Sequence, residues 1–313
     1  MKDRYYIGID LGGTNLKIAL FDSTCRIIGR QVLPTEIFAQ PKSLITAIVS
    51  SVNAIMAGRR LNTSAILGIG IGLPGPVDVT QGVVHFFPNI PGWKEVPLRS
   101  ILEEKLGLPV FVDNDANLMC LAEYKAGAAR GSTNAVCLTL GTGVGGGLII
   151  DGRLFRGSSF AAGEIGHVPI NEHGPACNCG GVACLESYIG NRRIAHRVRM
   201  IFKKDIPLED LSRMARRGNA KAAAIWKDVG RKLGVALVGV VNLLNPDRIV
   251  IGGGVANAGS VLFDAVSETI LMQAMVVQAK KVRVTKAQLG SDAGMIGAAF
   301  LVKEETDKRK TAR

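Results

Sequence analysis

The chain has 313 residues, a formal net charge of +12, and 47% hydrophobic and 20% charged residues. This length predicts one or two domains, and the composition excludes a disordered chain. The positive charge alone admits nucleic acid, an anionic membrane surface or an anionic substrate as a partner. Apart from Phe202, no aromatic residue is interleaved with the basic run 192–204. We therefore interpret these runs as solvated helix faces and expect no nucleic acid.

The uncharged stretch 131–150 is long enough to cross a membrane, yet it is rich in glycine and threonine. We interpret it as a buried hairpin. The N-terminal residues lack an apolar core followed by a small-residue cleavage site, because Asp10 interrupts the apolar run. We therefore expect no membrane partner, no signal peptide and a cytoplasmic location.

Hydrophobic periodicity predicts two halves of similar order. In the first half we expect a hairpin over 5–22, a strand over 27–33, a helix over 41–56, a strand over 66–73, a helix over 98–106, a strand over 110–112 and a helix over about 116–127. In the second half we expect a hairpin over 134–150, a strand near 153–155, helices through 187–201, 207–217 and 219–244, a strand over 248–251, a helix, a strand over 282–285 and a final helix over 293–303. Strands that alternate with helices predict a mostly parallel sheet in each half, with ligands beyond the carboxyl ends of the strands.

Each hairpin contains a turn suited to phosphate. The first turn carries Gly12, Gly13 and Thr14, and the second carries Gly141, Thr142 and Gly143. Glycine lets the backbone N–H groups come close to phosphate oxygens. The repetition predicts a duplicated fold that holds a nucleotide between its halves.

Two charged residues flank the first turn. A carboxylate at Asp10 would repel bare phosphate, so it indicates a cation such as Mg²⁺ between them, unless it only caps the turn. Lys17, on the returning strand, could neutralise phosphate or be an ordinary exposed lysine.

Asn114 and Asp115 follow an apolar strand and open a helix. An aspartate in that place can accept a proton from an attacking hydroxyl, as a base does in phosphoryl transfer. Asp115 could equally be a helix N-cap, and Asp113 is the nearby competitor for the base.

Three of the six cysteines lie within eight residues and follow a histidine, and together they form a Cys₃His set: His167, Cys177, Cys179 and Cys184. This set suits tetrahedral zinc in a closed, structural site, although unrelated free thiols are the alternative. The single residue between Cys177 and Cys179 is a tighter step than zinc fingers use. A bound metal would also fix Glu164 and Glu186, which flank its ligands and could accept hydrogen bonds from sugar hydroxyls. Cys25, Cys120 and Cys137 are predicted core residues.

The triplet Gly252–Gly254 follows a strand and precedes a helix. It permits close approach by a base or ribose, or tight packing of the helix on the strand.

Five motifs resemble the ROK family, whose name joins repressors, open reading frames and sugar kinases. They are Asp10–Lys17, Leu140–Gly147, Gly163–His167, Cys177–Glu186 and Asn245–Gly254. The resemblance implies an α/β, two-domain actin-like ATPase (ribonuclease H-like) fold, with duplicated mixed sheets, flanking helices and a cleft between domains. We place the domains at 1–117 and 118–313, with a C-terminal helix of about 293–313 that packs back on the first.

The resemblance also implies roles for single residues. Asp115 is the implied catalytic base, and the implied sugar contacts are Gly75, Asn89, Asn114, Asp115, Glu164, His167 and Glu186. The implied contacts of the phosphates, Mg²⁺ and adenosine are Asp10, Gly12, Gly13, Thr14, Lys17, Gly141, Thr142, Gly143, Gly253 and Gly254. His167 with the three clustered cysteines is the implied zinc site.

We therefore expect an ATP-dependent hexose 6-kinase with ATP, Mg²⁺ and structural Zn²⁺, acting on glucose and forming a homodimer or larger homo-oligomer. N-acetylmannosamine, N-acetylglucosamine, fructose and allose are alternative substrates. A non-catalytic sugar-sensing regulator is the alternative of another class. Because the first phosphate motif begins at residue 10, we expect no helix-turn-helix domain ahead of it.

Overall fold

The structure is a computed structural model, and it describes residues 4–35, 38, 40–87 and 93–311. The chain forms two compact units. The first comprises Met1–Lys125, Arg156–Ala162 and Ser291–Arg313, and the second comprises Ala126–Phe155 and Gly163–Gly290. Compared with the expected division after residue 117, the first unit keeps the helix that begins at Asp115 up to Lys125, and the C-terminal helix also belongs to this unit.

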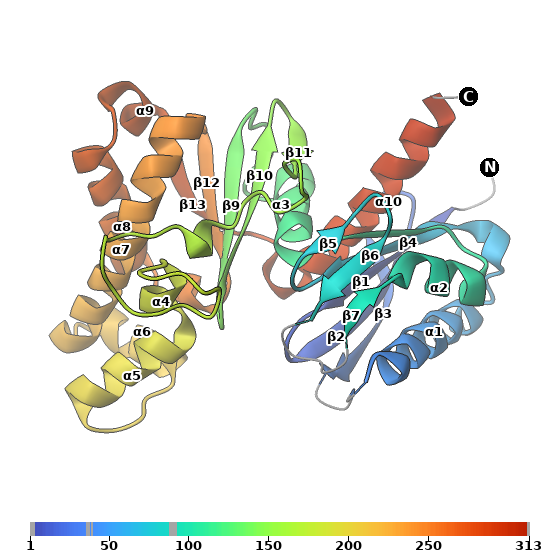
Figure 1. The fold of residues 1–313 in the computed structure, drawn as a ribbon, viewed down its shortest axis with the longest axis horizontal. Coiled ribbons are helices and arrows are strands. Elements are labelled where there is room, and N and C mark those ends of the chain that lie inside the picture. Colours follow the sequence, from blue (N-terminus) through green and yellow to red (C-terminus); the bar gives the residue numbers. More distant parts are fainter. Residues whose placement is uncertain (1–3, 36–37, 39, 88–92, 312–313) are drawn as a thin grey trace. The chain divides into compact units, whose positions relative to one another are not determined.

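The first unit is built on a five-stranded mixed sheet in the order β3-β2-β1-β4-β8 (Figure 1). Its strands are β1 (Tyr5–Leu11), β2 (Asn15–Phe21), β3 (Ile27–Pro34), β4 (Ile66–Leu73) and β8 (Val110–Asn114). The three strands β1, β2 and β3 form an antiparallel meander, and β4 and β8 add in parallel to β1. Because β1 and β8 run the same way, Asp10 and Asp115 lie at the same edge of this sheet.

Helices cover both faces of the first sheet. Alternate strand residues divide between two buried clusters: Ile7 and Ile9 pack with α1 (Pro41–Gly58) and α2 (Leu98–Leu106). Tyr6 and its neighbours pack with α3 (Asp115–Ala126) and α10 (Ala293–Thr311). Gly8 and Gly70 have no room for a side chain, since a Cβ would collide with carbonyls of α10. This close approach fixes the start of α10 beside Asp10.

The second unit repeats this design in the order β11-β10-β9-β12-β13. Its strands are β9 (Ala135–Leu140), β10 (Val144–Ile150), β11 (Arg153–Phe155), β12 (Arg248–Gly252) and β13 (Arg283–Lys286). Again three strands form an antiparallel meander and two add in parallel. The duplicated mixed sheets implied by the family resemblance are therefore confirmed. The mostly parallel sheet predicted from the alternation of strands and helices was wrong, because each sheet contains an antiparallel meander that makes two of its four strand pairings antiparallel.

The helices of the second unit are α4 (Glu186–Ile189), α5 (Asn191–Phe202), α6 (Leu208–Arg216), α7 (Ala220–Leu244), α8 (Ser260–Gln273) and α9 (Val276–Lys281). The prediction of a single helix over 187–201 was wrong. The helix is broken at Gly190, whose backbone is extended (φ −63°, ψ 149°). The break turns the start of α5 toward the second glycine turn. Short 3₁₀ turns occur at Thr63–Ala65, Ile165–His167, Gly254–Ala258 and Gly290–Asp292.

The sequence also missed a small three-stranded sheet of β5 (Val77–Asp78), β6 (Val83–Phe86) and β7 (Lys94–Val96). Strands of two to four residues are too short to show a clear alternation. Among the described residues, no helix has the length and apolar character needed to span a membrane.

Candidate functional site

The turn between β1 and β2 presents its backbone to solvent. A hydrogen bond from Gly12 N–H to the Asn15 carbonyl (2.9 Å) closes the turn, and Gly13 and Thr14 are exposed. Thr35, directly after β3, holds the turn by donating its hydroxyl to the Gly12 carbonyl and its N–H to the Thr14 carbonyl. The turn is thus held rigid while its tip is accessible to an anion.

Asp10 lies beneath this turn in a crowded environment. It is opposite Lys17 in the ladder, with 3.9 Å between a carboxylate oxygen and Lys17 Nζ. Burial raises the pKa of Asp10, Lys17 partly offsets this, and the nearby Asp292 adds to the increase. Lys17 Nζ also donates to the Ser291 carbonyl at 2.6 Å. Lys17 is therefore engaged with protein groups and is not simply an exposed lysine.

The two aspartates at the end of β8 differ sharply in their surroundings. Asp113 is fully buried and receives Arg156 Nε and Nη2 at 2.7 and 2.6 Å. Its other oxygen accepts from Asn117 Nδ2 at 3.0 Å and from the Asn114 N–H at 2.8 Å. Asp115 is half-buried at the first position of α3, and one of its oxygens accepts the Ala116 N–H at 2.8 Å.

Two expected sugar contacts of the first unit meet. Asn114 Nδ2 donates to the Gly75 carbonyl at 3.3 Å, and Gly75 has a positive φ of 88° that favours glycine. Asn114 Oδ1 accepts the Ala116 N–H and so caps α3. Asn89, the remaining expected contact of this unit, lies outside the described residues.

The turn between β9 and β10 receives a carboxylate from elsewhere in the chain. Glu186 Oε2 accepts the Val144 N–H at 2.8 Å, and a Cβ at Gly143 would lie 2.7 Å from that oxygen. The Asn191 N–H donates to the Gly141 carbonyl at 3.0 Å, which ties the start of α5 to the same turn. The structure thus brings Glu186, Thr142 and the α5 terminus together.

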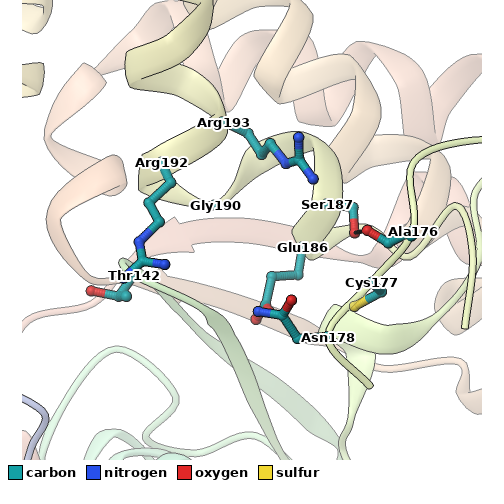
Figure 2. A pocket seen from close by; sticks show the side chains of 9 residues that line it. All are labelled: Thr142, Ala176, Cys177, Asn178, Glu186, Ser187, Gly190, Arg192 and Arg193. Carbon is teal, nitrogen blue, oxygen red and sulfur yellow. Dashed lines mark hydrogen bonds between the residues drawn. The ribbon is translucent and has the colours of Figure 1, made fainter. Parts of the chain in front are cut away.

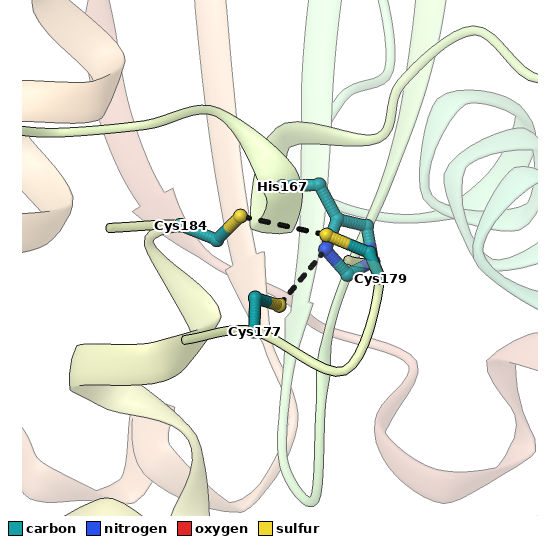
Figure 3. A group of neighbouring side chains, drawn as sticks. All are labelled: His167, Cys177, Cys179 and Cys184. Carbon is teal, nitrogen blue, oxygen red and sulfur yellow. Dashed lines mark hydrogen bonds between the residues drawn. The ribbon is translucent and has the colours of Figure 1, made fainter. Parts of the chain in front are cut away.

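The four proposed metal ligands converge, as Figure 3 shows. Their ligand atoms all lie within 4.8 Å of one another. His167 Nδ1 is 3.6 Å from Cys177 Sγ, and Cys179 Sγ is 3.6 Å from Cys184 Sγ. One imidazole and three thiols at this spacing fit tetrahedral zinc, which would take four protein ligands and no fifth. Cys25, Cys120 and Cys137 are buried, as expected of core residues.

Two of these thiols differ in acidity. Burial alone would raise the pKa of Cys177, but hydrogen bonds from the Cys179 N–H and from Ser187, Cys179 and His167 lower it to about 6. Burial, together with the neighbouring thiols, raises the pKa of Cys184 to about 12. A metal that binds the set must displace the Cys184 proton, so metal affinity will rise with pH.

Glu164 approaches the other side of the same imidazole. Glu164 Oε2 is 3.9 Å from His167 Nε2, while Nδ1 faces the thiols. Gly166 permits this arrangement, because a Cβ there would collide with the Val144 carbonyl. The four proposed metal ligands, Glu164 and Glu186 therefore form one connected group around the second turn.

Gly253 and Gly254 differ in their surroundings. Gly253 has a φ of 81°, and a Cβ there would collide with backbone atoms of Leu140, so this glycine is required for packing. Gly254 faces open space. Only Gly254 therefore has a free face toward a ligand.

The sequence analysis did not identify three arginines that lie at the candidate site. Arg156 pairs with Asp113, and no local pattern marks it. Arg192 and Arg193 line a pocket with Thr142 of the second turn and with residues 176–178 of the cysteine-containing loop (Figure 2). The whole lining comprises Thr142, Ala176, Cys177, Asn178, Glu186, Ser187, Gly190, Arg192 and Arg193. The basic run was visible in the sequence, but its position beside Thr142 depends on the break at Gly190.

Two repeated mixed sheets with a phosphate-type turn in each define the actin-like ATPase class of fold, which neighbouring solved structures share. Within that class the chain belongs to the ROK family, whose sequence pattern matches residues 6–305. The family expected from the motifs is thereby confirmed.

Glucokinases are among the relatives of this chain. That of Halalkalibacterium halodurans is 36% identical over 97% of each chain. That of Thermotoga maritima is 34% identical over 95% of this chain and 97% of its own. The xylose repressor of Caldicellulosiruptor bescii is 29% identical over 95% of this chain but only 77% of its own.

Solved structures of both kinases and a transcriptional regulator are similar to this chain. A ROK hexokinase from Thermus thermophilus has a TM-score of 0.82 at 33% identity, covering 97% of this chain and 99% of its own. A glucokinase from Streptomyces griseus, in complex with glucose and AMPPNP, has a TM-score of 0.81 at 30% identity, covering 96% and 99%. A ROK transcriptional regulator, homologous to the Escherichia coli MLC protein, has a TM-score of 0.88 at 27% identity, covering 97% and 78%.

Proposed function

We propose that this protein transfers the γ-phosphoryl group of ATP to the 6-hydroxyl of a hexose, glucose in the first place, with Asp115 as the base. The broader expectation, a hexose kinase of the ROK family, is confirmed by relatives matched over nearly their whole length. The choice of glucose is supported by glucokinases at 34–36% identity.

The observation that carries the mechanism is the contrast between Asp113 and Asp115. Asp113 is fully buried and accepts four hydrogen bonds, two of them from Arg156. It could accept a substrate proton only by breaking the ion pair with Arg156. Asp115 is half-buried at the edge of the sheet, so it is the aspartate that a hydroxyl can reach. The alternative of Asp113 as base is disfavoured for the same reason.

The remaining residues divide by chemistry. Glu164 and Glu186 offer acceptors for sugar hydroxyls, and His167 offers its Nε2–H as a donor when Nδ1 holds the metal. Gly75, Asn89 and Asn114 complete the set of sugar contacts. The turn at Gly12, Gly13 and Thr14 offers the N–H groups of Gly13 and Thr14 to phosphate, and the turn at Gly141, Thr142 and Gly143 offers those of Thr142 and Gly143. The N–H groups of Gly12 and Gly141 close their own turns on backbone carbonyls. Gly254 has an open face for adenosine, whereas Gly253 serves packing.

Two metals belong to the proposal. His167 and the three clustered cysteines would hold zinc, which fastens the loop that carries Glu186. Asp10 would contact Mg²⁺, which neutralises phosphate charge. Its raised pKa is consistent with a buried carboxylate that needs a cation, and Lys17 supplies only part of that charge.

The test is a coupled ADP-release assay with MgATP against hexoses and N-acetylhexosamines, with Asp115→Ala alongside. Turnover on glucose that the variant lacks supports the proposal. Preference for N-acetylmannosamine, N-acetylglucosamine, fructose or allose would keep the kinase and replace the substrate. Turnover by Asp115→Ala equal to that of the natural chain would exclude Asp115 as the base.

A sugar-sensing regulator without catalysis is the second candidate, because a ROK regulator has a TM-score of 0.88 to this chain. Binding of a hexose without turnover, in protein that contains its metal, would favour it. A salt-dependent shift of DNA would then be the next measurement.

We also propose a homodimer. Large apolar side chains are exposed at the ends of α7 and α8 and the start of α9: Leu243, Leu271, Met272, Met275, Val276 and Val277. Contiguous exposed apolar surface of this kind is typical of protein interfaces. Light scattering of the natural chain and of Met272→Lys measures whether this surface joins two copies.

A further inference from the structure

Arg192 and Arg193 are both in the first turn of α5, and both line the pocket that contains Thr142 and Glu186 (Figure 2). Successive helical residues point about 100° apart, so both side chains reach the pocket only because it wraps around the start of the helix. Both residues are exposed. Nothing in the proposed catalytic set uses them.

The two arginines differ from the two arginines that follow them on α5 in having no acidic partner. Arg197 pairs with Asp228, Arg199 with Asp205, and Arg213 with Asp210. Within the described part of the chain, neither Arg192 nor Arg193 forms an ion pair. Neutralisation by protein carboxylates therefore accounts for Arg197 and Arg199 but not for this pair.

The position of the pair beside the second turn is fixed by backbone contacts. The Asn191 N–H donates to the Gly141 carbonyl at 3.0 Å. Gly190 packs against the turn, because a Cβ there would be 3.2 Å from the Thr142 carbonyl. The one carboxylate of the pocket, Glu186, already accepts the Val144 N–H. The pocket therefore presents two guanidinium groups and a threonine hydroxyl, with a single carboxylate that is partly satisfied.

We propose that Arg192 and Arg193 form a phosphate-binding site, continuous with the turn at Thr142, that holds a phosphate of the phosphoryl donor. A guanidinium group is planar and matches phosphate oxygens in a bidentate fashion, which suits this role better than a lysine. Naming the donor as the source rests on the proposed kinase function, whereas the phosphate chemistry of the site does not. The other possible source of the same chemistry is the hexose 6-phosphate product.

The first measurement is calorimetric titration of the natural chain with inorganic tripolyphosphate, without sugar. We expect Arg192→Gln and Arg193→Gln each to weaken binding about tenfold, and Arg192→Lys to recover part of the loss. Arg231→Gln is the matched control, because Arg231 is an exposed arginine of the same unit on α7. Equal affinity of the double variant and the natural chain would overturn the site, and so would an equal loss in Arg231→Gln.

Steady-state kinetics then separates the two sources. A raised KM for MgATP with an unchanged KM for glucose assigns the site to the donor. Weaker inhibition by glucose 6-phosphate with an unchanged KM for MgATP assigns it to the product, which retains the phosphate site but overturns the donor assignment. Binding of tripolyphosphate through the arginines in a protein without kinase activity would retain the site and refute the proposed function. Melting temperature and circular dichroism show that each variant is folded.

Discussion

The two glycine-rich turns have similar sequences but are supported by different parts of their units. The first turn has its own carboxylate, since Asp10 lies on β1 opposite Lys17 of β2. In the second turn Thr139 occupies the comparable place, and the carboxylate comes from Glu186, 42 residues beyond its hydrogen-bond donor Val144. The first turn is thus organised by strands and α10, and the second by a loop that contains a metal-type cluster.

This difference indicates how each unit keeps its polar groups in place. Strand pairing and close helix packing fix Asp10 and Asp115 without any added group. Glu186 and Glu164 flank a loop whose described strand contacts are two isolated bridges, Pro169–Cys184 and Ala176–Val182. Scattered backbone hydrogen bonds, such as those from the Ile170 N–H to the Ala183 carbonyl and from the Leu185 N–H to the Val168 carbonyl, hold this loop in place of regular strand pairing. Four converging ligands can add a cross-link to it.

The largest effect is expected at Asp115. Asp115→Asn should lower turnover by about 10²- to 10⁴-fold with little change in melting temperature, because the base is lost while the helix start is retained. Steady-state kinetics and thermal unfolding measure this. An undiminished turnover number would show that the sheet edge of the first unit does not supply the base.

Arg156→Met should destabilise the first unit by about 3 kcal/mol, because it leaves the buried Asp113 carboxylate without its cation. Denaturant unfolding measures this. Adding Asp113→Asn to Arg156→Met should restore much of the stability, since the uncompensated charge is then removed. A double variant as unstable as the sum of the single ones would mean that the ion pair is not the cause.

Metal removal should affect the second turn and leave the first unchanged. Chelation, or Cys179→Ser, should lower the melting temperature by several degrees and weaken hexose binding. Amide hydrogen exchange should increase at 141–147 and stay unchanged at 10–17, because only the second turn depends on the loop. Equal protection of both turns before and after chelation would contradict the comparison.

Glycine replacements sharpen the comparison further. A Cβ at Gly294 would lie 2.6 Å from Asp10 Oδ1 in crowded surroundings, so Gly294→Ala should destabilise by about 1–3 kcal/mol. A Cβ at Gly143 meets only the end of the Glu186 side chain, which can move aside. Gly143→Ala should therefore raise the KM for hexose with a smaller loss of stability. Unfolding and kinetics of the two variants, measured together, give the contrast.

The smallest effect concerns the pH dependence at Asp10. Because burial raises the pKa of Asp10, the folded chain holds this proton more tightly than the unfolded chain. The resulting stability is present below the unfolded pKa and is lost as pH rises through the folded pKa. Asp10→Asn should therefore melt slightly higher than the natural chain at pH 7 without Mg²⁺, and the difference should vanish in acid. A lower melting temperature at pH 7 would show that the pairing with Lys17 outweighs the burial.

The sequence determined the features that depend on local spacing. Alternating apolar runs around Gly/Thr turns predicted both hairpins, and their repetition predicted two similar sheets. The spacing of Cys177, Cys179 and Cys184 after His167 predicted a cluster that the structure brings within ligand distance. These patterns are readable because strand pairing across a short turn and a compact loop constrain neighbouring residues directly.

Only the tertiary structure decided which polar groups meet across long separations. Asp113 and Arg156 are 43 residues apart, and Arg192 reaches Thr142 only because the helix breaks at Gly190. Local sequence could not separate Asp113 from Asp115, since both lie at the end of β8 and differ in what packs against them. Which side chains contact each other depends on how distant elements pack, and the hydrophobic periodicity of the chain does not predict it.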